Sequence, residues 1–231
     1  MGTKSDGLDI GNRMKDYEEV FRQTLPRRIP VILRIDGRAF HTITRRRFGK
    51  NWSQEFVDQM IETAKAVMSD ISGCDICYSQ SDEVSFLLTD YRTIKSDSWF
   101  GYDVRKLISI SASLAASIFS RIYGKNVCFD SRCFSIPQDE VCNYFIWRQI
   151  DATRNAIQMA GREYFSHKEL YKINCNGIQE KLFQEKEINF NDYPTIRKRG
   201  FCIIDGEVDF EIPIFTKDRN YIERWVYVRE D

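Results

Sequence analysis

Short apolar runs of extended character alternate along the chain with stretches that have the spacing of helices. Residues 31–35 are mostly apolar and β-branched, which predicts a buried strand that ends at Asp36. Residues 76–88 predict two further strands joined by a polar bend at residues 80–83, and residues 127–134 alternate like a fourth strand. Asp36 and the bend are therefore both expected at strand ends.

Three segments carry apolar residues at three-and-four spacing, as helices do. The first begins at Ser53 and ends near residue 72, the second covers residues 102–123, and the third opens at Pro137. The elements up to the fourth strand have the order β, α, β, β, α, β. This order predicts a ferredoxin-like α+β fold, an antiparallel sheet with two helices on one face.

The last third of the chain is less regular. A hairpin is predicted at Asp205-Gly206, between strands at residues 201–204 and 208–212. No linker divides the chain, so residues 1–231 are expected to form a single unit, with a core at about residues 28–160 and a C-terminal extension at about residues 161–231.

Length and composition narrow the class of protein. The 231 residues are 42% hydrophobic, which is enough to hold one large domain by packing alone. No apolar run approaches the ~20 residues that cross a bilayer, and the first nine residues lack the apolar core of a signal peptide. A cytoplasmic protein with no membrane contact is expected.

Seven cysteines form an odd set among apolar neighbours, which is typical of reduced thiols rather than of a disulfide framework. Cys74 and Cys77 have the spacing of a redox or zinc site. They lie in a predicted strand, however, where residues three apart are expected to point to opposite faces.

The charges cancel overall, with 34 basic and 34 acidic side chains, which argues against a protein that coats nucleic acid without selection. They are unevenly placed along the chain. Between residues 27 and 50, eight cations accompany a single acid, Asp36, and a second basic cluster occupies residues 197–199. Such clusters are either solvated surfaces or sites for phosphate-bearing ligands.

Asp36 and Asp82 are the candidate chemical groups. The first strand and the hairpin can be neighbours in the sheet, with strands ~4.8 Å apart, so both carboxylates can reach the same ion. Mg²⁺ would relieve their repulsion, and two such ions ~3.5–4 Å apart promote displacement at phosphorus. Gly37 would let a phosphate approach closely, or its carbonyl oxygen would be a further ligand of the ion. Alternatively, Asp36 caps a turn, and Asp82 and Glu83 fill a polar hairpin tip.

Four segments carry a more specific pattern. They are Arg34-Ile35-Asp36-Gly37-Arg38-Ala39-Phe40-His41, Tyr78-Ser79-Gln80-Ser81-Asp82-Glu83-Val84-Ser85-Phe86, Phe129-Asp130-Ser131-Arg132 and Trp147-Arg148-Gln149-Ile150-Asp151. In order and spacing they resemble the tRNAHis guanylyltransferase superfamily, over about residues 12–200.

The resemblance implies a catalytic domain similar to a polymerase palm that works in the opposite direction. The 5′ end of a tRNA is activated with ATP or GTP, or through an existing triphosphate, and the 3′-hydroxyl of an incoming nucleotide attacks the activated phosphate. Two Mg²⁺ ions, nucleoside triphosphates as substrates and a homotetramer, a dimer of dimers, are implied as well. Residues 1–231 would be one catalytic unit, whose extension contributes to packing and to tRNA binding.

The resemblance also assigns a site position by position. Asp36 and Asp82 match the metal-ligating carboxylates, with the Gly37 carbonyl as a further ligand, and Glu83 matches a second catalytic acid. The nucleotide would lie against Asp36, Gly37, Arg38, Ala39, Phe40, His41, Lys50, Ser81 and Asp82. The triphosphate or the tRNA backbone would lie against Arg27, Arg28, Arg45, Arg46, Arg132, Arg148, Asn155, Lys198 and Arg199.

Some of these positions have simpler interpretations. Arg148 and Asp151, three apart on one helix, can be a surface pair. His41 can be a core or helix-start histidine. Trp147 is expected to pack in the core rather than to stack on a base.

Residues 153–159 depart from the guanylyltransferases proper, which carry His-Ile-Asn-Asn-Leu-Tyr-Asn there, and only Asn155 is in register. The chain instead looks like the guanylyltransferase-like branch of bacteria and archaea, associated with template-directed repair of truncated tRNA 5′ ends, with G addition to tRNAHis as a further outcome. Basic patches then position the RNA while base pairing selects the nucleotide. A palm-fold enzyme similar to nucleotide cyclases and a non-catalytic tRNA-binding protein are the alternatives.

Overall fold

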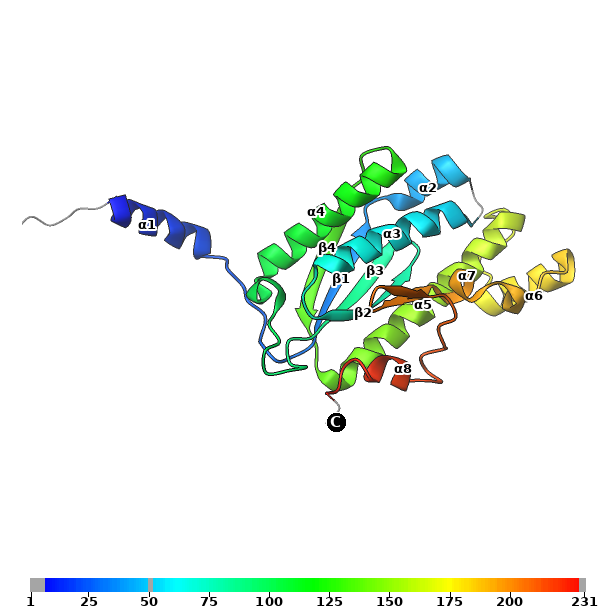
Figure 1. Cartoon of the computed structure of the whole chain (residues 1–231). Coiled ribbons are helices and arrows are strands. Elements are labelled where there is room, and N and C mark those ends of the chain that lie inside the picture. Colours follow the sequence, from blue (N-terminus) through cyan, green and yellow to red (C-terminus); the bar gives the residue numbers. More distant parts are fainter. Residues whose placement is uncertain (1–6, 50–51, 229–231) are drawn as a thin grey trace, which may run out of the picture.

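The computed structural model describes residues 7–49 and 52–228. Figure 1 shows its elements. They are α1 (Gly7–Glu19), β1 (Val31–Gly37), α2 (Phe40–Phe48), α3 (Gln54–Asp70), β2 (Cys74–Gln80), β3 (Glu83–Leu88), η1 (Trp99–Tyr102), α4 (Val104–Tyr123), β4 (Phe129–Ser135), α5 (Gln138–Tyr164), α6 (Cys175–Lys186), η2 (Phe190–Asp192), α7 (Thr195–Arg199), β5 (Phe201–Ile204), β6 (Glu207–Asp209) and α8 (Asn220–Glu223).

A single antiparallel sheet runs through the molecule, with the strand order β4-β1-β3-β2-β5-β6. Its first four strands, with α3 and α4 on one face, form the predicted ferredoxin-like arrangement (Figure 1). The fold class expected from the sequence is confirmed.

The helices on this face begin where the sequence supplies caps. Ser53 accepts a hydrogen bond from the backbone N–H of Phe56 at the start of α3, and Asp103 accepts from the N–H groups of Arg105 and Lys106 at the start of α4. Their apolar sides, including Met60 of α3, pack with alternate residues of β1 and β3 into the larger core.

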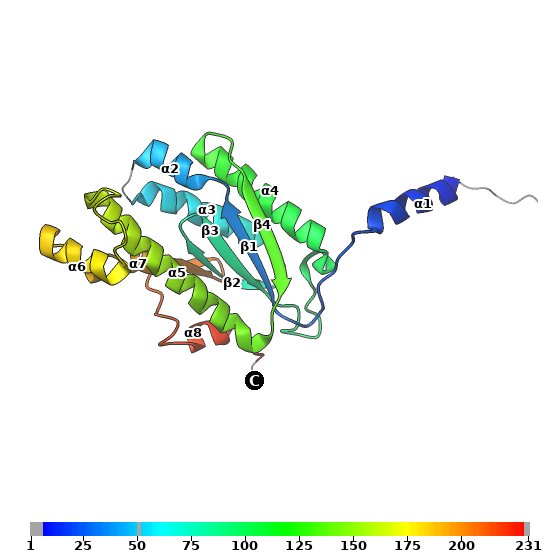
Figure 2. The same ribbon diagram turned by 180° about the vertical axis from the view of Figure 1, so that it is seen from behind.

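The opposite face of the sheet is covered by α5, which crosses it obliquely (Figure 2). Val141 and Phe145 of α5 pack on Ile32 of β1 and on residues of β2 and β3 in a second core. The rows of side chains that α5 crosses change character along the strands. Ile32 is paired with Leu87 and Phe134 in an apolar row, whereas the rows nearer the end of β1 are polar and charged.

The C-terminal extension continues the same sheet. β5 pairs with β2, and β6 pairs with β5 across the predicted Asp205-Gly206 turn. Gly200 makes this join possible, because its φ is +81° and a Cβ there would lie 2.2 Å from the carbonyl oxygen of Ser79. The expected boundary near residue 160 falls inside α5.

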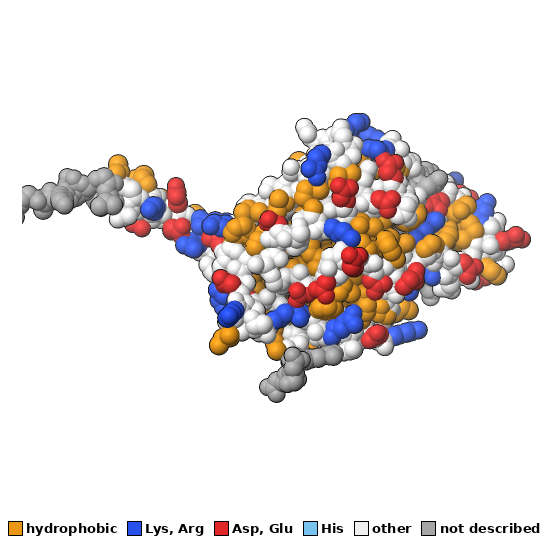
Figure 3. Space-filling model, viewed as in Figure 1, with side chains coloured by type: hydrophobic (Ala, Val, Ile, Leu, Met, Phe, Trp, Pro, Cys, Tyr) orange, Lys and Arg blue, Asp and Glu red, His pale blue; other side chains and the backbone are white. Residues whose placement is uncertain are grey.

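α1 extends away from the body of the molecule in both views (Figures 1 and 2). Its C-terminal end is held by Arg105, which donates to the carbonyl of Glu18 at 2.8 Å. The face in Figure 3 carries acidic and basic side chains intermixed, as expected for a chain with no net charge. Within the described residues, no helix has the length and apolar character required to span a bilayer.

Candidate functional site

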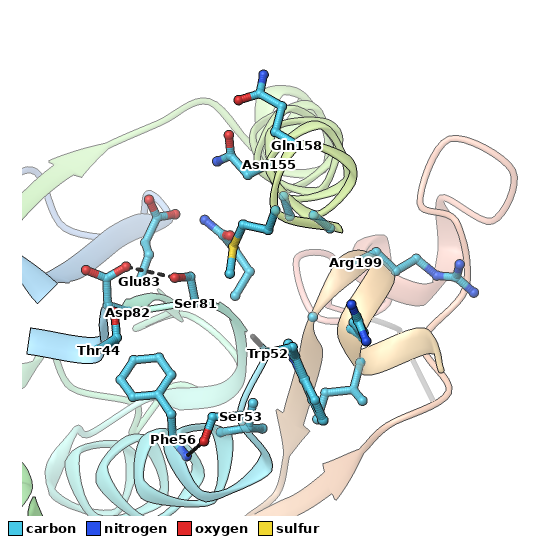
Figure 4. Close-up of a pocket in the computed structure, with 18 of the residues that line it drawn as sticks. Thr44, Trp52, Ser53, Phe56, Ser81, Asp82, Glu83, Asn155, Gln158 and Arg199 are labelled. Atoms are coloured by element: carbon cyan, nitrogen blue, oxygen red, sulfur yellow. Dashed lines mark hydrogen bonds between the residues drawn. The ribbon is translucent and has the colours of Figure 1, made fainter. Parts of the chain in front are cut away.

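A cavity of about 480 Å³ opens at the end of the sheet where β1 stops and β2 turns into β3. Helices α2 and α3 form one wall, α5 forms another, and the join between α7 and β5 closes the third side (Figure 4). Its lining includes Asp36, Thr44, Phe48, Trp52, Ser53, Phe56, Gln80, Ser81, Asp82, Glu83, Arg148, Asp151, Asn155, Gln158, Met159, Arg162, Glu163, Arg197, Arg199 and Phe201.

Strand register brings several acids to this end of the sheet. Asp36 is directly opposite Glu83 of β3 on one side and Asp130 of β4 on the other, and paired residues share a face. The next row holds Arg34 and Arg132, again side by side. The α5-side face of the sheet is therefore acidic at its end, cationic one row in, and apolar beyond.

Asp36 and Asp82 are brought together as predicted. The N–H of Gly37 donates to the carbonyl of Asp82 at 3.1 Å, which fixes the end of β1 against the hairpin tip. Burial, followed by the negative charge of Asp36, raises the pKa of Asp82 to about 6. Burial and the charge of Asp130 raise the pKa of Asp36. This pair of carboxylates is electrostatically unfavourable without a cation.

Glu83 is buried, and Arg148 of α5 takes up its carboxylate. Nε of Arg148 donates to Oε1 at 2.6 Å and Nη2 donates to Oε2 at 2.7 Å, while Arg34 lies 3.8 Å from Oε2. Burial raises the pKa of Glu83, although Arg148 acts in the opposite direction. Arg148 also contacts Asp151 at 3.3 Å but is only 5% exposed, so the interpretation as a surface pair is wrong.

The residues expected to surround the nucleotide divide into two groups. Asp36, Ser81 and Asp82 line the cavity, and the Ser81 hydroxyl donates to Oδ1 of Asp82 at 3.0 Å (Figure 4). Arg38 and His41 are exposed beside it, at the turn into α2. Lys50 lies outside the described residues.

Phe40 and Gly37 are explained by packing. The Phe40 ring is buried among the rings of Phe56, Phe119 and Phe129, and a Cβ on Gly37 would come within 2.4 Å of that ring. Ala39, at φ 58°, turns the chain so that Phe40 can enter the core. Gly37 is therefore required by the ring above it, a reason that the sequence did not reveal.

The residues expected to contact the triphosphate or the tRNA backbone do not form one surface. Arg148, Asn155 and Arg199 line the cavity, although the guanidinium of Arg199 is directed away from the carboxylates (Figure 4) and donates to the carbonyl of Ile212. Lys198 donates to the carbonyl of Asn191 outside the cavity.

Arg27 and Arg28 lie at the opposite end of β1 from Asp36. Arg27 pairs with Asp90 at 2.6 Å and Arg28 donates to the carbonyl of Asp90 at 2.7 Å. Arg45 and Arg46 are exposed on α2, and Arg132 is exposed on β4. Most of the cations between residues 27 and 50 are thus separated into two groups, one at each end of β1. The contacts expected for Arg27 and Arg28 would belong to a surface separate from the cavity.

Several cavity residues were not among the site residues assigned from the sequence. Trp52, Asp151 and Arg197 line it, and Arg197 is held by Glu163 at 2.6 Å. Asp130, which is paired with Asp36 in the sheet, lies in a segment that the sequence singled out but was given no role, although the alternation of the fourth strand indicates that it shares a face with Arg132. The prediction that Trp147 packs in the core is wrong, since this side chain is 54% exposed.

The two cysteines with redox spacing lie in the core. A β-bulge between Cys74 and Ile76 shifts the strand, so Cys74 and Cys77 both pack on the side of α3 and α4 and the expectation of opposite faces is wrong. Burial raises the pKa of Cys77 to about 12, which leaves it unreactive. All seven cysteines are free thiols, as expected.

The donor set at the cavity suits a hard cation. Among the described residues no group of three or more His, Cys, Asp or Glu side chains is placed to hold a metal alone. Two carboxylates with raised pKa values are present, Asp36 and Asp82, and Mg²⁺ is commonly held by one or two carboxylates together with waters and substrate phosphates. The site therefore fits an ion that arrives with a nucleotide.

Comparison with known proteins gives consistent matches. Residues 11–137 match the sequence model of the family described as tRNAHis guanylyltransferase. The chain is 28% identical to a probable tRNAHis guanylyltransferase of Dictyostelium discoideum, over 86% of this chain and 85% of the relative. A solved bacterial tRNAHis guanylyltransferase-like protein in complex with ATP is 44% identical, with a TM-score of 0.91, over 95% of this chain and all of the other. A complex of such a bacterial protein with GTP is 41% identical, with a TM-score of 0.85, over 95% and 99% of the chains.

Proposed function

The chain belongs to the tRNAHis guanylyltransferase family and is a nucleotidyltransferase, and from this we propose that it extends the 5′ end of tRNA in the 3′ to 5′ direction on a template. The observation that carries the proposal is the placement of Asp36 and Asp82 at one end of the sheet, in the wall of a cavity of about 480 Å³. A cavity of this volume is in the range that holds a small-molecule ligand.

The reaction proceeds in two transfers. In the first, an oxygen of the tRNA 5′-phosphate attacks the α-phosphorus of ATP or GTP, and pyrophosphate leaves; a tRNA that already carries a 5′-triphosphate omits this step. In the second, the 3′-hydroxyl of the incoming nucleoside triphosphate attacks the 5′ phosphorus, and the activating nucleotide, or pyrophosphate, leaves. A new phosphodiester bond joins the added nucleotide to the tRNA.

Asp36 and Asp82 are proposed to hold two Mg²⁺ ions, with the Gly37 carbonyl as a further ligand. When bound, such ions polarise attacking and leaving oxygens at phosphorus. Ser81 orients Asp82 through its hydrogen bond, and Arg148 holds Glu83 beside this pair. The N-terminus of α2, which begins at Phe40, is proposed to contact phosphate, because the first backbone N–H groups of a helix lack a helical partner and its dipole favours an anion.

The remaining assignments are part of the same proposal. Asn155 of α5 faces the cavity opposite Asp82 (Figure 4) and is proposed to contact the triphosphate or the RNA. Arg45, Arg46, Arg132 and the C-terminal extension with Lys198 and Arg199 would bind the tRNA backbone. Template-directed repair of truncated 5′ ends in the cytoplasm, by a homotetramer, is the biological setting that we propose.

One assay tests this function. Purified protein is incubated with Mg²⁺, labelled nucleoside triphosphates and a tRNA that lacks its 5′ nucleotide, with and without a complementary base on the opposite strand. Addition that requires the complementary base is expected. Cyclic or condensed nucleotides formed without RNA would support the cyclase-like alternative, and salt-sensitive tRNA binding without addition would support the non-catalytic one.

Substitutions connect the activity to the cavity. Asp36→Ala and Asp82→Ala should each abolish addition, because each variant leaves a single carboxylate of the pair for the two proposed ions. Asp97→Ala is the matched control, since this exposed carboxylate pairs with Arg27 at the far end of the sheet. Retained addition in either cavity variant would contradict the assigned metal site.

A further inference from the structure

Trp147 is a large aromatic side chain held rigidly at the surface. It is 54% exposed on α5, yet its ring is fixed from two sides. Tyr144 packs against it edge-on at 5.8 Å, and the Tyr144 hydroxyl is itself hydrogen-bonded to Ser85 at 2.8 Å. The guanidinium of Arg148 lies 4.5 Å from the centre of the Trp147 ring. Little conformational entropy would be lost if a ligand covered the exposed part of the ring.

The position of Trp147 is at the rim of the cavity. The next residue, Arg148, and Asp151, about one helical turn away, both line the cavity, whereas Trp147 does not. Tyr144 also contacts Phe134 at 5.8 Å, which places this side of α5 next to the edge strand β4 (Figure 2). A ligand on Trp147 would therefore lie beside the nucleotide in the cavity, not in its place.

Two exposed arginines lie on the elements next to the ring. Arg132 on β4 and Arg154 on α5 have side chains that are 52% and 61% exposed. Each is paired with one carboxylate, Asp130 or Asp151, and such exposed pairs are weak enough for a phosphate to compete with them. Aromatic rings flanked by arginines are how proteins hold RNA strands without reading their sequence.

We propose that Trp147 stacks on a terminal or unpaired base of the RNA strand whose end enters the cavity, with Arg132 and Arg154 contacting its backbone. The proposal rests on the proposed function, because RNA is the ligand expected there. It adds a subsite that positions the strand next to the reacting nucleotide, and template-directed addition needs such positioning, since base pairing alone does not align the 5′ end with the cavity.

Binding without chemistry tests this subsite. The affinities of wild-type protein, Trp147→Ala and Trp147→Phe are measured without added nucleotide, by anisotropy of a labelled tRNA lacking its 5′ nucleotide and of an eight-nucleotide single strand. Ile150→Ala is the matched control, because Ile150 is 59% exposed one turn along the same helix. Trp147→Ala should bind both RNAs about 5- to 150-fold more weakly, whereas Trp147→Phe and Ile150→Ala should keep most of the affinity. The affinity for ATP should be unchanged in all three variants.

The outcomes separate the possible occupants. Unchanged RNA binding by Trp147→Ala would overturn the proposal. A loss of ATP affinity would also overturn it, because a free nucleotide would then occupy the ring. A loss of self-association in light scattering would overturn it as well, because a second copy of the chain would then cover the ring. Because binding is read without turnover, a wild-type protein that binds RNA through Trp147 but adds no nucleotide would refute the proposed function and leave the stacking subsite standing.

Discussion

The pair formed by Arg148 and Glu83 allows a quantitative prediction. Both side chains are more than nine-tenths buried, and two charge-assisted hydrogen bonds of 2.6 and 2.7 Å join them. Arg148→Met removes both bonds and leaves the Glu83 carboxylate with Arg34, at 3.8 Å, as its remaining cation. Breaking a buried pair in this way costs about 3–5 kcal/mol. For a chain of this length, that corresponds to a melting temperature about 6–20 °C lower.

Urea unfolding followed by circular dichroism at pH 7 measures this loss. Arg132→Met is the control, because its pair with Asp130 is more than half exposed and should contribute less than about 1 kcal/mol. The double variant Glu83→Gln with Arg148→Met should lose less than the sum of the single variants, since neither charge is then left alone. A loss for Arg148→Met no greater than that for Arg132→Met would refute the reasoning.

Two further predictions concern the same end of the sheet. The pKa of Asp82 is raised to about 6 in the fold, so Asp82 binds more protons in the folded than in the unfolded state between pH 4 and 6, and its charge destabilises the metal-free protein as the pH rises. Asp82→Asn should therefore raise the free energy of unfolding by up to about 3 kcal/mol at pH 8 and by about half of that at pH 5. Urea titrations at several pH values measure this gain, and a gain that grows on acidification would contradict the assigned cause. Gly200→Ala should cost at least about 2 kcal/mol of stability in thermal unfolding, because its Cβ would meet the Ser79 carbonyl. Gly206→Ala is the control, since Gly206 has a similar φ of +82° but open space around it, and it should cost less. Equal losses in the two variants would exclude the clash as the reason.

The proposed stacking subsite and the carboxylate pair have different physical origins. Asp36 and Asp82 are fixed by strand pairing and a backbone hydrogen bond, so substitution of either side chain should leave the sheet intact. Trp147 is fixed by side-chain packing on one helix. Loss of RNA binding and loss of nucleotide addition can therefore be separated by mutation.

The sequence by itself determined the strands, the three helices α3, α4 and α5, and their order, whereas α1, α2 and α6 were not predicted. Helix caps such as Ser53 and Asp103, the period of apolar residues and the turn at Asp205-Gly206 act within a few residues, so each element is specified locally. The neighbourhood of Asp36 and Asp82 followed as well, because the order β, α, β, β, α, β leaves few arrangements for the first strand and the hairpin.

Tertiary structure alone decided how the side chains of the site are used. Arg148 meets Glu83, 65 residues away, only because α5 crosses the sheet with the Arg148 side facing the strands. Helical periodicity did not show that the preceding residue, Trp147, would remain exposed to solvent. The length of β1 likewise places Arg27 and Arg28 far from Asp36, although all three residues lie within one short stretch of the sequence. Local spacing encodes which face of an element a residue occupies, but what covers that face depends on packing between distant segments.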